Sequence, residues 1–359
     1  MRYRPFGASG LRVSELFLGA MTFGEQGGVG APLDECRRMV DAYADAGGNV
    51  IDTAINYRGG ASEEVLGELL QGRRDRFVLA TKFGVSRDVK SISDAPSGMS
   101  DPNAAGGHRK NLMHSLETSL RRLRTDYVDI YWLHLHDRHT PIDETMRALD
   151  DAVRAGKVLY VGVSDTPAWV IARAQVLAEW RGWTAFAGLQ VPYSLVQRDI
   201  ERELLPLAEA HGMTVAAWSP LAGGVLSGKF TRTGAGSGGG VGGGATRRDP
   251  NSLSERELAA AHAVDAVADE LGTTSSRVAI AWTRQRSPIV HPIVGARTVE
   301  QLADNLGVLD VVLPDDAMAR LDAAAPVELG FPHDFIAEVR PWVFGEADGR
   351  TDARVHPRP

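Results

Sequence analysis

The sequence predicts an α/β protein in which eight parallel strands alternate with helices and close into a single (β/α)8 TIM barrel. Short apolar segments alternate with segments of helical spacing along most of the chain, and eight strands follow the N-terminal residues. Strands that alternate with helices form a parallel sheet, and eight is the number that closes a barrel. An open, doubly wound sheet is the alternative, and the even spacing favours the barrel. No linker interrupts the alternation, so we expect one barrel domain over residues 1–325.

The first half of the chain is expected to begin with a β-hairpin, because residues 7–10 form a turn between two strand-like segments. A helix over 34–46 stops at two glycines, and Ser62 with two following glutamates begins another helix, since carboxylates favour the positive end of the helix dipole. The expected order is a strand at 16–19, a helix at 34–46, a strand ending at 52, a helix at 62–70, a strand ending at 82, a helix at 108–123 and a strand at 128–133.

The second half continues the alternation and adds long loops. Irregular segments near 84–107 and 222–252 follow strands, which places them on the C-terminal face of the barrel. The last segment, 326–359, is expected to line a pocket in part, through Phe331, and otherwise to form a flexible tail. The expected helices are 142–155, 167–180, 199–210, 275–286 and 298–306, and the strands are 158–163, 186–190, 214–218 and 289–294.

Composition narrows the class of protein. The chain is 43% hydrophobic with a net charge of -7, and it has no basic patch interleaved with aromatic residues, which argues against nucleic acid as the main partner. Its single cysteine, Cys36, excludes an intramolecular disulfide and suits a reducing compartment. Neither a signal peptide nor an apolar run of about 18 residues is found, so no membrane span is expected. These features predict a cytoplasmic protein in which Cys36 is a buried structural thiol.

Polar side chains follow three consecutive strands at the edge where a parallel barrel carries its site. Asp52 and Tyr57 follow the first strand, Lys82 ends the second, and His134 ends the third. A phenol beside a lysine and a histidine is a proton donor suited to a carbonyl oxygen. Each residue also has an ordinary interpretation as a cap, an ion pair or core packing, but the four together favour a carbonyl-reducing enzyme.

Three motifs resemble known binding sites but lack the sequence context that those sites need. Gly234–Gly239 fits GxGxxG by its letters, but it lies in a glycine run with no strand before it and no helix after it. The segment 223–230 approaches a P-loop, yet Phe230 replaces the hydroxyl residue that holds Mg²⁺, although its amides and Lys229 suit a phosphate. His134, His136 and Asp137 with His139 could suggest a metal, but no acidic or histidine partner at ligand spacing occurs elsewhere and no CxxC is found, so no metal site is expected.

The remaining motifs occur in a fixed order on successive strand ends. They are Asp52-Thr53-Ala54 with Tyr57, Thr81-Lys82, residues 129–134, Gly162-Val163-Ser164, Gln190 with Tyr193-Ser194, Trp218-Ser219-Pro220-Leu221 and Gly295-Ala296-Arg297. This chain resembles the aldo-keto reductases, NADPH-dependent (β/α)8 barrels, and is most similar to a bacterial branch with long loops on the site face. The resemblance covers roughly residues 1–325.

The resemblance implies an NADP-dependent oxidoreductase that reduces an aldehyde or ketone to an alcohol. Asp52, Tyr57, Lys82 and His134 would form its catalytic tetrad, with Tyr57 as the general acid and, in the alcohol direction, as the base. A free tyrosine has a pKa near ~10 and is a poor acid, and a nearby ammonium is expected to lower that pKa. Asp52 would hold Lys82, and His134 would orient the carbonyl while a hydride leaves the nicotinamide.

The resemblance also implies an NADPH site along the barrel mouth. Trp218 would stack on the nicotinamide, and Ser164 and Gln190 would bind its carboxamide. Arg297 would contact the 2′-phosphate, since a guanidinium forks onto phosphate oxygens. The expected cofactor-binding residues are Gly19, Met21, Thr22, Ser164, Asp165, Gln190, Trp218, Ser219, Pro220, Leu221, Gly223, Lys229, Gly295, Arg297, Gln301 and Asn305.

Two positions depart from the family pattern. Asp165 stands where asparagine is usual, and Gln301 where arginine or lysine is often found. The alternatives to a reductase are a non-catalytic NADPH-binding regulatory subunit and a Schiff-base aldolase that uses Lys82. Sugar-derived ketones, small aldehydes and natural-product ketones all remain open as substrates. The aromatic residues Phe23, Trp132, Tyr193 and Phe331 either line the pocket or pack elsewhere, and the oligomeric state is not predicted.

Overall fold

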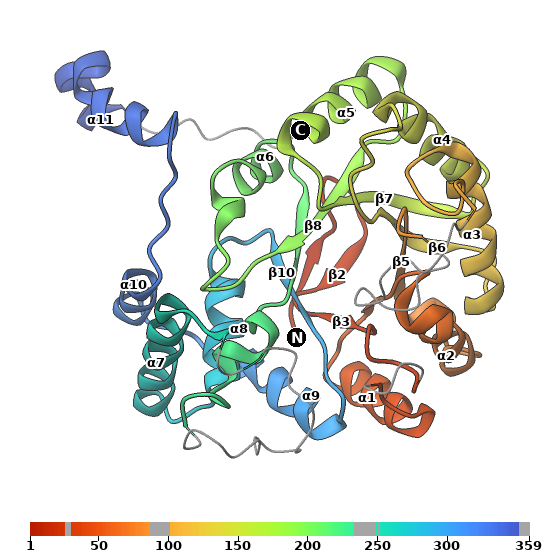
Figure 1. Cartoon of the computed structure of the whole chain (residues 1–359), viewed down its shortest axis with the longest axis horizontal. Coiled ribbons are helices and arrows are strands. Elements are labelled where there is room, and N and C mark those ends of the chain that lie inside the picture. Colours follow the sequence, from red (N-terminus) through yellow and green to blue (C-terminus); the bar gives the residue numbers. More distant parts are fainter. Residues whose placement is uncertain (26–29, 87–100, 233–248, 250–251, 352–359) are drawn as a thin grey trace.

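The computed structural model confirms a closed barrel of eight parallel strands (Figure 1) and describes residues 1–25, 30–86, 101–232, 249 and 252–351. Each strand pairs with its neighbours in the chain order of the barrel, and β10 pairs with both β9 and β3 to close the ring. The strands are β3 (Phe17–Gly19), β4 (Val50–Asp52), β5 (Val78–Phe83), β6 (Val128–Leu133), β7 (Val158–Ser164), β8 (Phe186–Pro192), β9 (Thr214–Trp218) and β10 (Val290–Val294).

An antiparallel hairpin of β1 (Tyr3–Pro5) and β2 (Arg12–Ser14) precedes the barrel, as expected. Phe6, which directly follows β1 in this hairpin, packs edge-on against Trp132 of β6, with ring centroids 6.1 Å apart. Trp132 fits inside the barrel because β7 and β8 carry glycine where its ring lies: a Cβ at Gly162 of β7 would lie 2.2 Å from its Cε3, and one at Gly188 of β8 would lie 2.8 Å from its Cη2. Side chains therefore fill the interior of the barrel, so a site can form only at the C-terminal ends of the strands.

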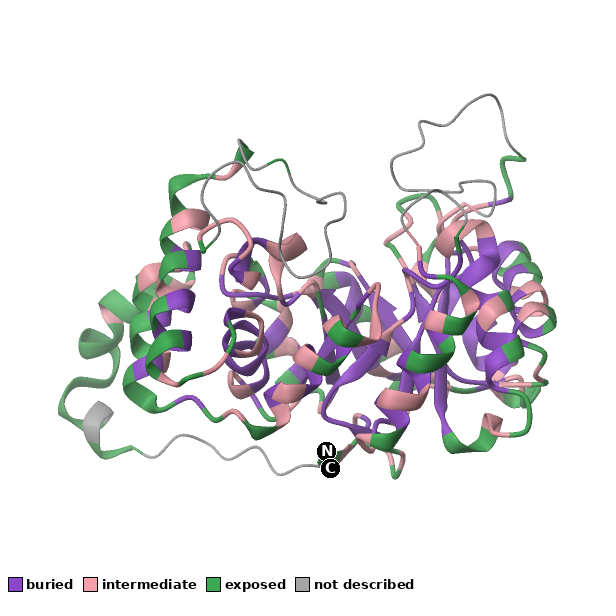
Figure 2. Ribbon diagram, turned by 90° about the horizontal axis from the view of Figure 1, so that it is seen from below, coloured by how far each residue is buried: buried purple, intermediate pink, exposed green. Residues whose placement is uncertain are grey.

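A ring of helices surrounds the strands and buries one face of each helix against them, as the burial colouring in Figure 2 shows. The ring consists of α1 (Leu33–Asp45), α2 (Ala61–Leu69), α3 (Arg109–Leu123), α4 (Ile142–Arg154), α5 (Ala168–Arg181), α6 (Leu204–Ala210), α8 (Ser275–Gln285) and α9 (Val299–Leu306). Thr274 and Thr298 cap α8 and α9 by accepting main-chain hydrogen bonds, which fixes where these two helices begin. In the described residues no helix is long and apolar enough to cross a bilayer.

Three helices were not predicted: α7 (Glu255–Glu270), α10 (Asp315–Ala324) and α11 (His333–Phe344). The first packs on α8 and α10 outside the ring, and α11 stands away from the body at the upper left of Figure 1. The helix expected over 199–210 is instead a 3₁₀ turn, η3 (Asp199–Glu201), followed by the shorter α6. The glycine run with the GxGxxG letters, 234–239, lies outside the described residues, as does 87–100 of the first long loop.

Candidate active site

The loop after β4 carries Tyr57 on a kinked 3₁₀ turn, η1 (Tyr57–Gly60). The kink uses left-handed backbone at three successive residues, with φ of 55° at Arg58, 64° at Gly59 and 101° at Gly60. An L-residue with a side chain rarely adopts φ above zero, so the two glycines make this turn possible. The turn places Tyr57 on the wall of a cavity at the barrel mouth.

An ion pair behind this loop holds it in place. Arg122 of α3 donates to the carbonyl oxygen of Ile55 at 2.8 Å and to Glu63 Oε2 at 3.2 Å. Glu63 is fully buried and also accepts from Thr81 Oγ1 at 2.7 Å, which ties the loop to β5. A Cβ at Gly60 would lie 2.3 Å from the Arg122 Cζ, so the guanidinium needs glycine there. Sequence reasoning did not find this support, because no sequence motif links Arg122 on α3 to Glu63 on α2.

Lys82 of β5 is completely buried and forms an ion pair with Asp52 at the end of β4. Its ammonium also donates to the carbonyl oxygen of Thr53 at 2.8 Å. The second carboxylate oxygen of Asp52 accepts from Gln190 Nε2 at 2.9 Å. Asp52 is thus oriented from both sides, and it fixes the position of the ammonium.

Tyr57 and His134 face one another beside this ion pair. The Lys82 Nζ atom lies 4.8 Å from the centroid of the Tyr57 ring, and the His134 ring meets Tyr57 edge-on with centroids 6.0 Å apart. The buried Nδ1 atom of His134 has no hydrogen-bond partner among the described residues. The four residues predicted from separate strand ends therefore lie together in the structure.

Burial controls the protonation of these groups. It raises the pKa of Tyr57 above its ordinary value, because the loss of solvation outweighs the charge and hydrogen bond of Lys82, which act in the opposite direction. This differs from the expectation that the ammonium would lower that pKa. For Lys82, burial lowers the pKa, but Asp52 and Tyr57 together raise it by more than burial lowers it. The pKa of Lys82 therefore lies above its ordinary value. Burial and the charge of Lys82 lower the pKa of His134 to about 3.

A cavity of about 530 Å³ opens at the C-terminal ends of the strands, and Asp52, Tyr57 and His134 line it. Lys82 is not on its wall and lies behind Asp52 and Tyr57. Every residue expected to bind the cofactor lines this cavity. Five further lining residues were not predicted from the sequence, and these are Gly224, Ile280, Ile293, Val294 and Ala296. Of these, only Ile280 on α8 is distant in sequence from a predicted motif.

Cationic and amide groups gather at one end of the cavity, next to the 3₁₀ turn η4 (Ala222–Ser227). Gly223 and Gly224 have φ of 67° and 96°, and the Gly223 amide donates to Ser219 Oγ at 3.2 Å. A Cβ at Gly224 would lie 2.5 Å from Lys229 Nζ, so glycine lets the ammonium approach the turn. The amides of Ala222, Gly223 and Gly224 already donate within the turn, so the group here that fits a phosphate is the Lys229 cation.

The two departures from the family pattern have direct structural consequences. Asp165 accepts from Trp218 Nε1 at 3.3 Å, and burial raises its pKa. Trp218 is 37% exposed on the cavity wall and is held in its orientation by this bond. Gln301 accepts from the main-chain N–H of Arg297 at 3.0 Å, so its side chain orders the loop after β10 that carries Arg297.

The aromatic residues considered as pocket-lining do not line the cavity. Phe23, Trp132 and Tyr193 are fully buried in the core, so for them the packing alternative is correct. Phe331 is 85% exposed on the C-terminal segment, away from the lining residues. No group of three potential metal ligands occurs within the ranges that the structure describes. Cys36 is a buried free thiol, which confirms its predicted placement.

The fold and this cavity define an enzyme built on a parallel α/β barrel, with a buried ammonium, a phenol and a neutral imidazole at the mouth. The chain belongs to the aldo/keto reductase family: the model of the "Aldo/keto reductase family" matches residues 15–326. Members of this family are oxidoreductases that use NADP(H), and the donor set of the cavity fits that cofactor. The family, the barrel and the cofactor predicted from the sequence are thereby confirmed.

Three similar proteins of known name come from fungi. Norsolorinic acid reductase of Aspergillus flavus is 36% identical over 92% of this chain and 82% of its own length. Aryl-alcohol dehydrogenase [NADP(+)] of Phanerodontia chrysosporium is 38% identical over 90% of this chain and 86% of its own length. A putative aryl-alcohol dehydrogenase of Saccharomyces cerevisiae is 36% identical over 92% of this chain and 88% of its own length.

Proposed function

We propose that this protein reduces an aromatic aldehyde or ketone to the alcohol, with NADPH as the hydride source and Tyr57 as the general acid. The observation that carries the proposal is the fully buried Lys82 ammonium, which is fixed by Asp52 and lies 4.8 Å from the Tyr57 ring centroid at the edge of the cavity. The cytoplasmic location expected from the sequence belongs to the same proposal and is supported by the buried free thiol of Cys36.

Tyr57 delivers a proton to the oxygen of the substrate. Because burial raises its pKa, Tyr57 stays protonated near neutrality and is present in the donor form. As negative charge develops on the substrate oxygen, the buried Lys82 ammonium stabilises both this charge and the phenolate that forms when the proton leaves. Asp52 keeps the ammonium in position and balances its charge.

His134 acts as a neutral hydrogen-bonding group. With a pKa of about 3 it carries no positive charge near neutrality, and it lines the cavity, so the ring nitrogen other than the buried Nδ1 can hydrogen-bond to a substrate. Its edge-on contact with Tyr57 places both rings on the same side of the cavity. The carbonyl oxygen is thereby oriented toward the phenol before the proton moves.

The remaining lining residues are suited to hold the cofactor, which when bound supplies a hydride to the carbonyl carbon. Trp218 lines the cavity and is 37% exposed, and Gln190 and Ser164 provide polar groups on the same wall. Lys229, which lies beside the turn at Gly223 and Gly224, would hold the pyrophosphate. The loop of Arg297, ordered by Gln301, would hold the adenosine 2′-phosphate.

The aromatic substrate class is supported by the names of two relatives, which are aryl-alcohol dehydrogenases. The test measures NADPH oxidation with a substituted benzaldehyde and with an aliphatic aldehyde of equal carbon number. We expect kcat/KM to be at least about tenfold higher for the benzaldehyde. This ratio corresponds to about 1.4 kcal/mol of additional binding in the transition state. Equal values would contradict the substrate class, and no turnover of any carbonyl would contradict the reductase.

The Schiff-base alternative is not favoured by the state of Lys82. A lysine nucleophile must be neutral to attack a carbonyl, and such lysines have lowered pKa values. Here Asp52 and Tyr57 raise the pKa of Lys82, and the side chain lies behind the cavity wall. The regulatory alternative is disfavoured because all four tetrad residues are present and lie together.

Replacing Arg297 with alanine is expected to weaken NADPH binding at least about tenfold, since a hydrogen bond to a charged group contributes about 1.5–3 kcal/mol. NADH lacks the 2′-phosphate, so its affinity should change little. Tryptophan fluorescence titration of both cofactors, with the wild-type protein and with the Arg297→Ala variant, measures the two dissociation constants. An equal loss for NADPH and NADH would remove the 2′-phosphate role.

The rate of carbonyl reduction is expected to be flat between about pH 5 and pH 8. His134, with its pKa lowered to about 3, is already neutral throughout this range, and the raised pKa values of Tyr57 and Lys82 keep both protonated. Alcohol oxidation needs deprotonated Tyr57 and should therefore rise with pH. Profiles of kcat in both directions check this, and a fall in the reduction rate between pH 6 and pH 8 would show that a histidine cation takes part.

A further inference from the structure

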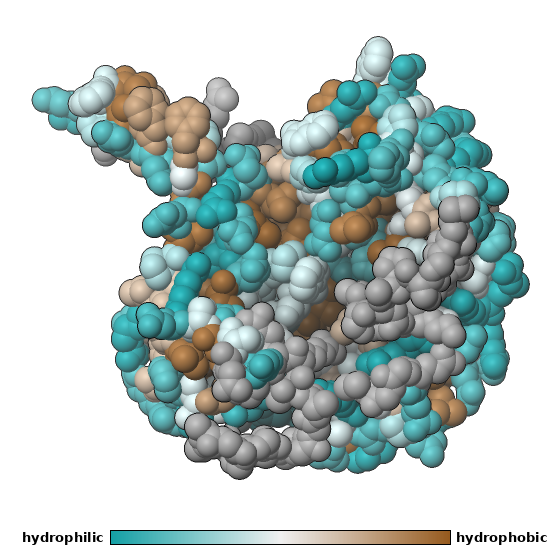
Figure 3. Space-filling view, viewed as in Figure 1, coloured by the Kyte–Doolittle hydropathy of each residue, from teal (hydrophilic) through white to brown (hydrophobic). Residues whose placement is uncertain are grey.

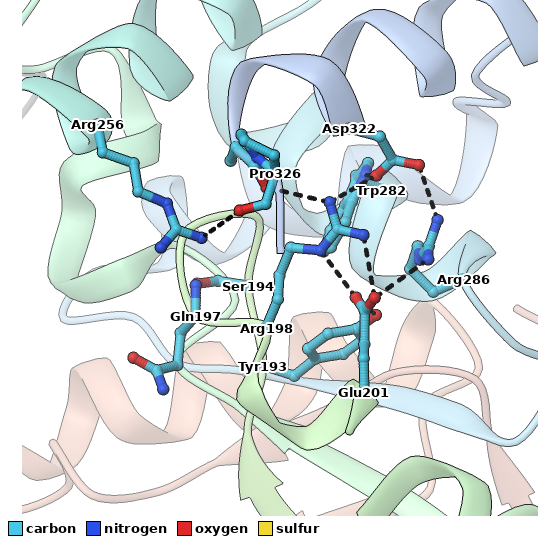
Figure 4. Close-up of polar contacts among 11 residues, drawn as sticks. Tyr193, Ser194, Gln197, Arg198, Glu201, Arg256, Trp282, Arg286, Asp322 and Pro326 are labelled. Carbon is cyan, nitrogen blue, oxygen red and sulfur yellow. Dashed lines mark hydrogen bonds and ion pairs between the residues drawn. The ribbon is translucent and has the colours of Figure 1, made fainter. Parts of the chain in front are cut away.

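The segment after α10 is fixed to the body by arginine side chains that bind its main-chain carbonyls (Figure 4). Arg198 donates to Ala325 O at 3.2 Å, Arg256 to Pro326 O at 3.1 Å, and Arg202 to Glu328 O at 2.9 Å. Arg198 is 6% exposed and also pairs with Glu201 and Asp322, so this anchor is part of the folded core. The start of the C-terminal segment is therefore rigidly placed.

Beyond this anchor the chain becomes an arm, defined here as residues 330–344, which leaves the body (Figure 1). Its helix α11 has no buried residue, and its first turn touches the body through His333 Nε2 and Glu203 Oε1 at 3.3 Å. The arm nevertheless carries large apolar side chains, which colour it brown in Figure 3. They are Phe331, Phe335, Ile336, Trp342, Val343 and Phe344, which are 85%, 52%, 56%, 82%, 65% and 58% exposed. A cluster of exposed aromatic residues of this size marks an interaction surface.

A second apolar surface lies on the outer side of α5 of the same chain. Trp169, Val176 and Trp180 are 69%, 61% and 73% exposed and follow one another at spacings of seven and four residues. These spacings place them on one face of the helix, and we call this face the α5 ridge. Neither surface contributes to the cofactor cavity.

The two surfaces match in length and in charge. The ridge extends over eleven helical steps, or about 16 Å, and the twelve residues of α11 extend about 18 Å. The ridge carries the cation of Arg181, which stacks on Trp180 with its Cζ 4.5 Å from the ring centroid. With Arg173, Glu179 and Arg181 the helix α5 has a net charge of +1, whereas α11 has -1 from Asp334, Glu338 and Arg340. Packing of the arm on the α5 ridge would thus bury apolar side chains of both surfaces and bring opposite net charges together.

We propose that the arm of one copy of this chain packs on the α5 ridge of a second copy, and that the reciprocal contact closes a two-fold symmetric dimer. Each chain offers one arm and one ridge, and a two-fold axis makes both contacts at once, so neither surface is left open to a third chain. Aromatic side chains bury ~150–250 Å² each, so two such contacts would remove on the order of 1,600 Å² of surface, the size of a standard specific interface. The carbonyl anchor fixes where the arm begins and reduces the entropy lost when it docks.

Light scattering with size-exclusion chromatography on the full chain tests the dimer. We expect the wild-type protein to be dimeric, and Trp342→Asp on the arm or Trp180→Asp on the ridge each to weaken the dimer at least about thirtyfold, as loss of an interface tryptophan does. Val312→Asp is the matched control, because Val312 is 74% exposed but lies on neither surface, and it should stay dimeric. A wild-type monomer, or a dimer that survives both tryptophan variants, would overturn the proposal.

Cross-linking identifies which surfaces meet. The native thiol of Cys36 is buried, so a short bis-maleimide would react at introduced cysteines. A mixture of Ile336→Cys and Val176→Cys chains should give a cross-linked dimer, whereas Val176→Cys alone should not. An internal cross-link in the doubly substituted monomer would show that the arm folds onto its own barrel. Binding of a monomer to phospholipid vesicles would show a lipid surface instead, and either result contradicts the dimer.

Discussion

Replacing Tyr57 with phenylalanine is expected to lower kcat for carbonyl reduction by about 10²–10⁴-fold, the contribution of a positioned general acid. The phenyl ring keeps its edge-on contact with His134 and its place beside Lys82, so the cavity keeps its shape. NADPH affinity should therefore be nearly unchanged. Single-turnover measurement of hydride transfer, combined with a fluorescence titration of NADPH, separates these two effects.

The matched control for this variant is Tyr160→Phe. Tyr160 lies next to Phe6 of the N-terminal hairpin, with ring centroids 6.2 Å apart, and does not line the cavity. Removing its hydroxyl should leave kcat within the error of the wild-type value. If Tyr57→Phe retained full activity, the proton would have to come from another group, and the general-acid assignment would be wrong.

Replacing Lys82 with methionine is expected to abolish turnover and to destabilise the fold by about 3–5 kcal/mol, because it leaves the Asp52 carboxylate buried without its counter-ion. Gln190, which donates to Asp52 at 2.9 Å, compensates for only part of that charge. The double variant Asp52→Asn/Lys82→Met removes both charges and should recover most of the stability while activity stays lost. Thermal unfolding midpoints of the three proteins, measured beside an activity assay, test both statements.

A surface lysine provides the control for stability. Lys157 pairs with Glu117, and the two side chains are 37% and 43% exposed. Exposed pairs contribute about 0–1 kcal/mol, so Lys157→Met should hardly move the unfolding midpoint. A double variant no more stable than Lys82→Met would show that the buried pair is not a coupled unit.

The sequence was sufficient to predict the barrel, because alternation of strand and helix is a local pattern. The helix α7 was not predicted from the sequence, because the apolar residues of this helix are mostly alanine and it follows the long glycine-rich segment. The capping box of Ser254 and Glu257 at its start was the signal that could have found it. The helix α11 was not predicted either, because a helix that buries nothing gives no core-facing pattern.

For the site, the sequence predicted which residues meet but not their electrostatic state. The order of motifs placed Asp52, Lys82 and His134 at neighbouring strand ends, and a parallel barrel brings such ends together. The direction of the Tyr57 pKa shift depends on how completely the phenol is desolvated, which no spacing reveals. The support from Arg122 to Glu63 joins residues 59 positions apart, and one sequence contains no signal for such a contact.

The buried thiol of Cys36 has a consequence for a protein that handles reactive carbonyl compounds. Electrophilic aldehydes damage proteins by adding to thiolates and by condensing with neutral amines. Burial raises the pKa of Cys36 to about 11, so almost no thiolate is present near neutrality. The chain has only five lysines, and Lys82 is enclosed as a paired cation. We therefore expect these two side chains to resist addition of carbonyl substrates, since neither presents a thiolate or a neutral amine near neutrality.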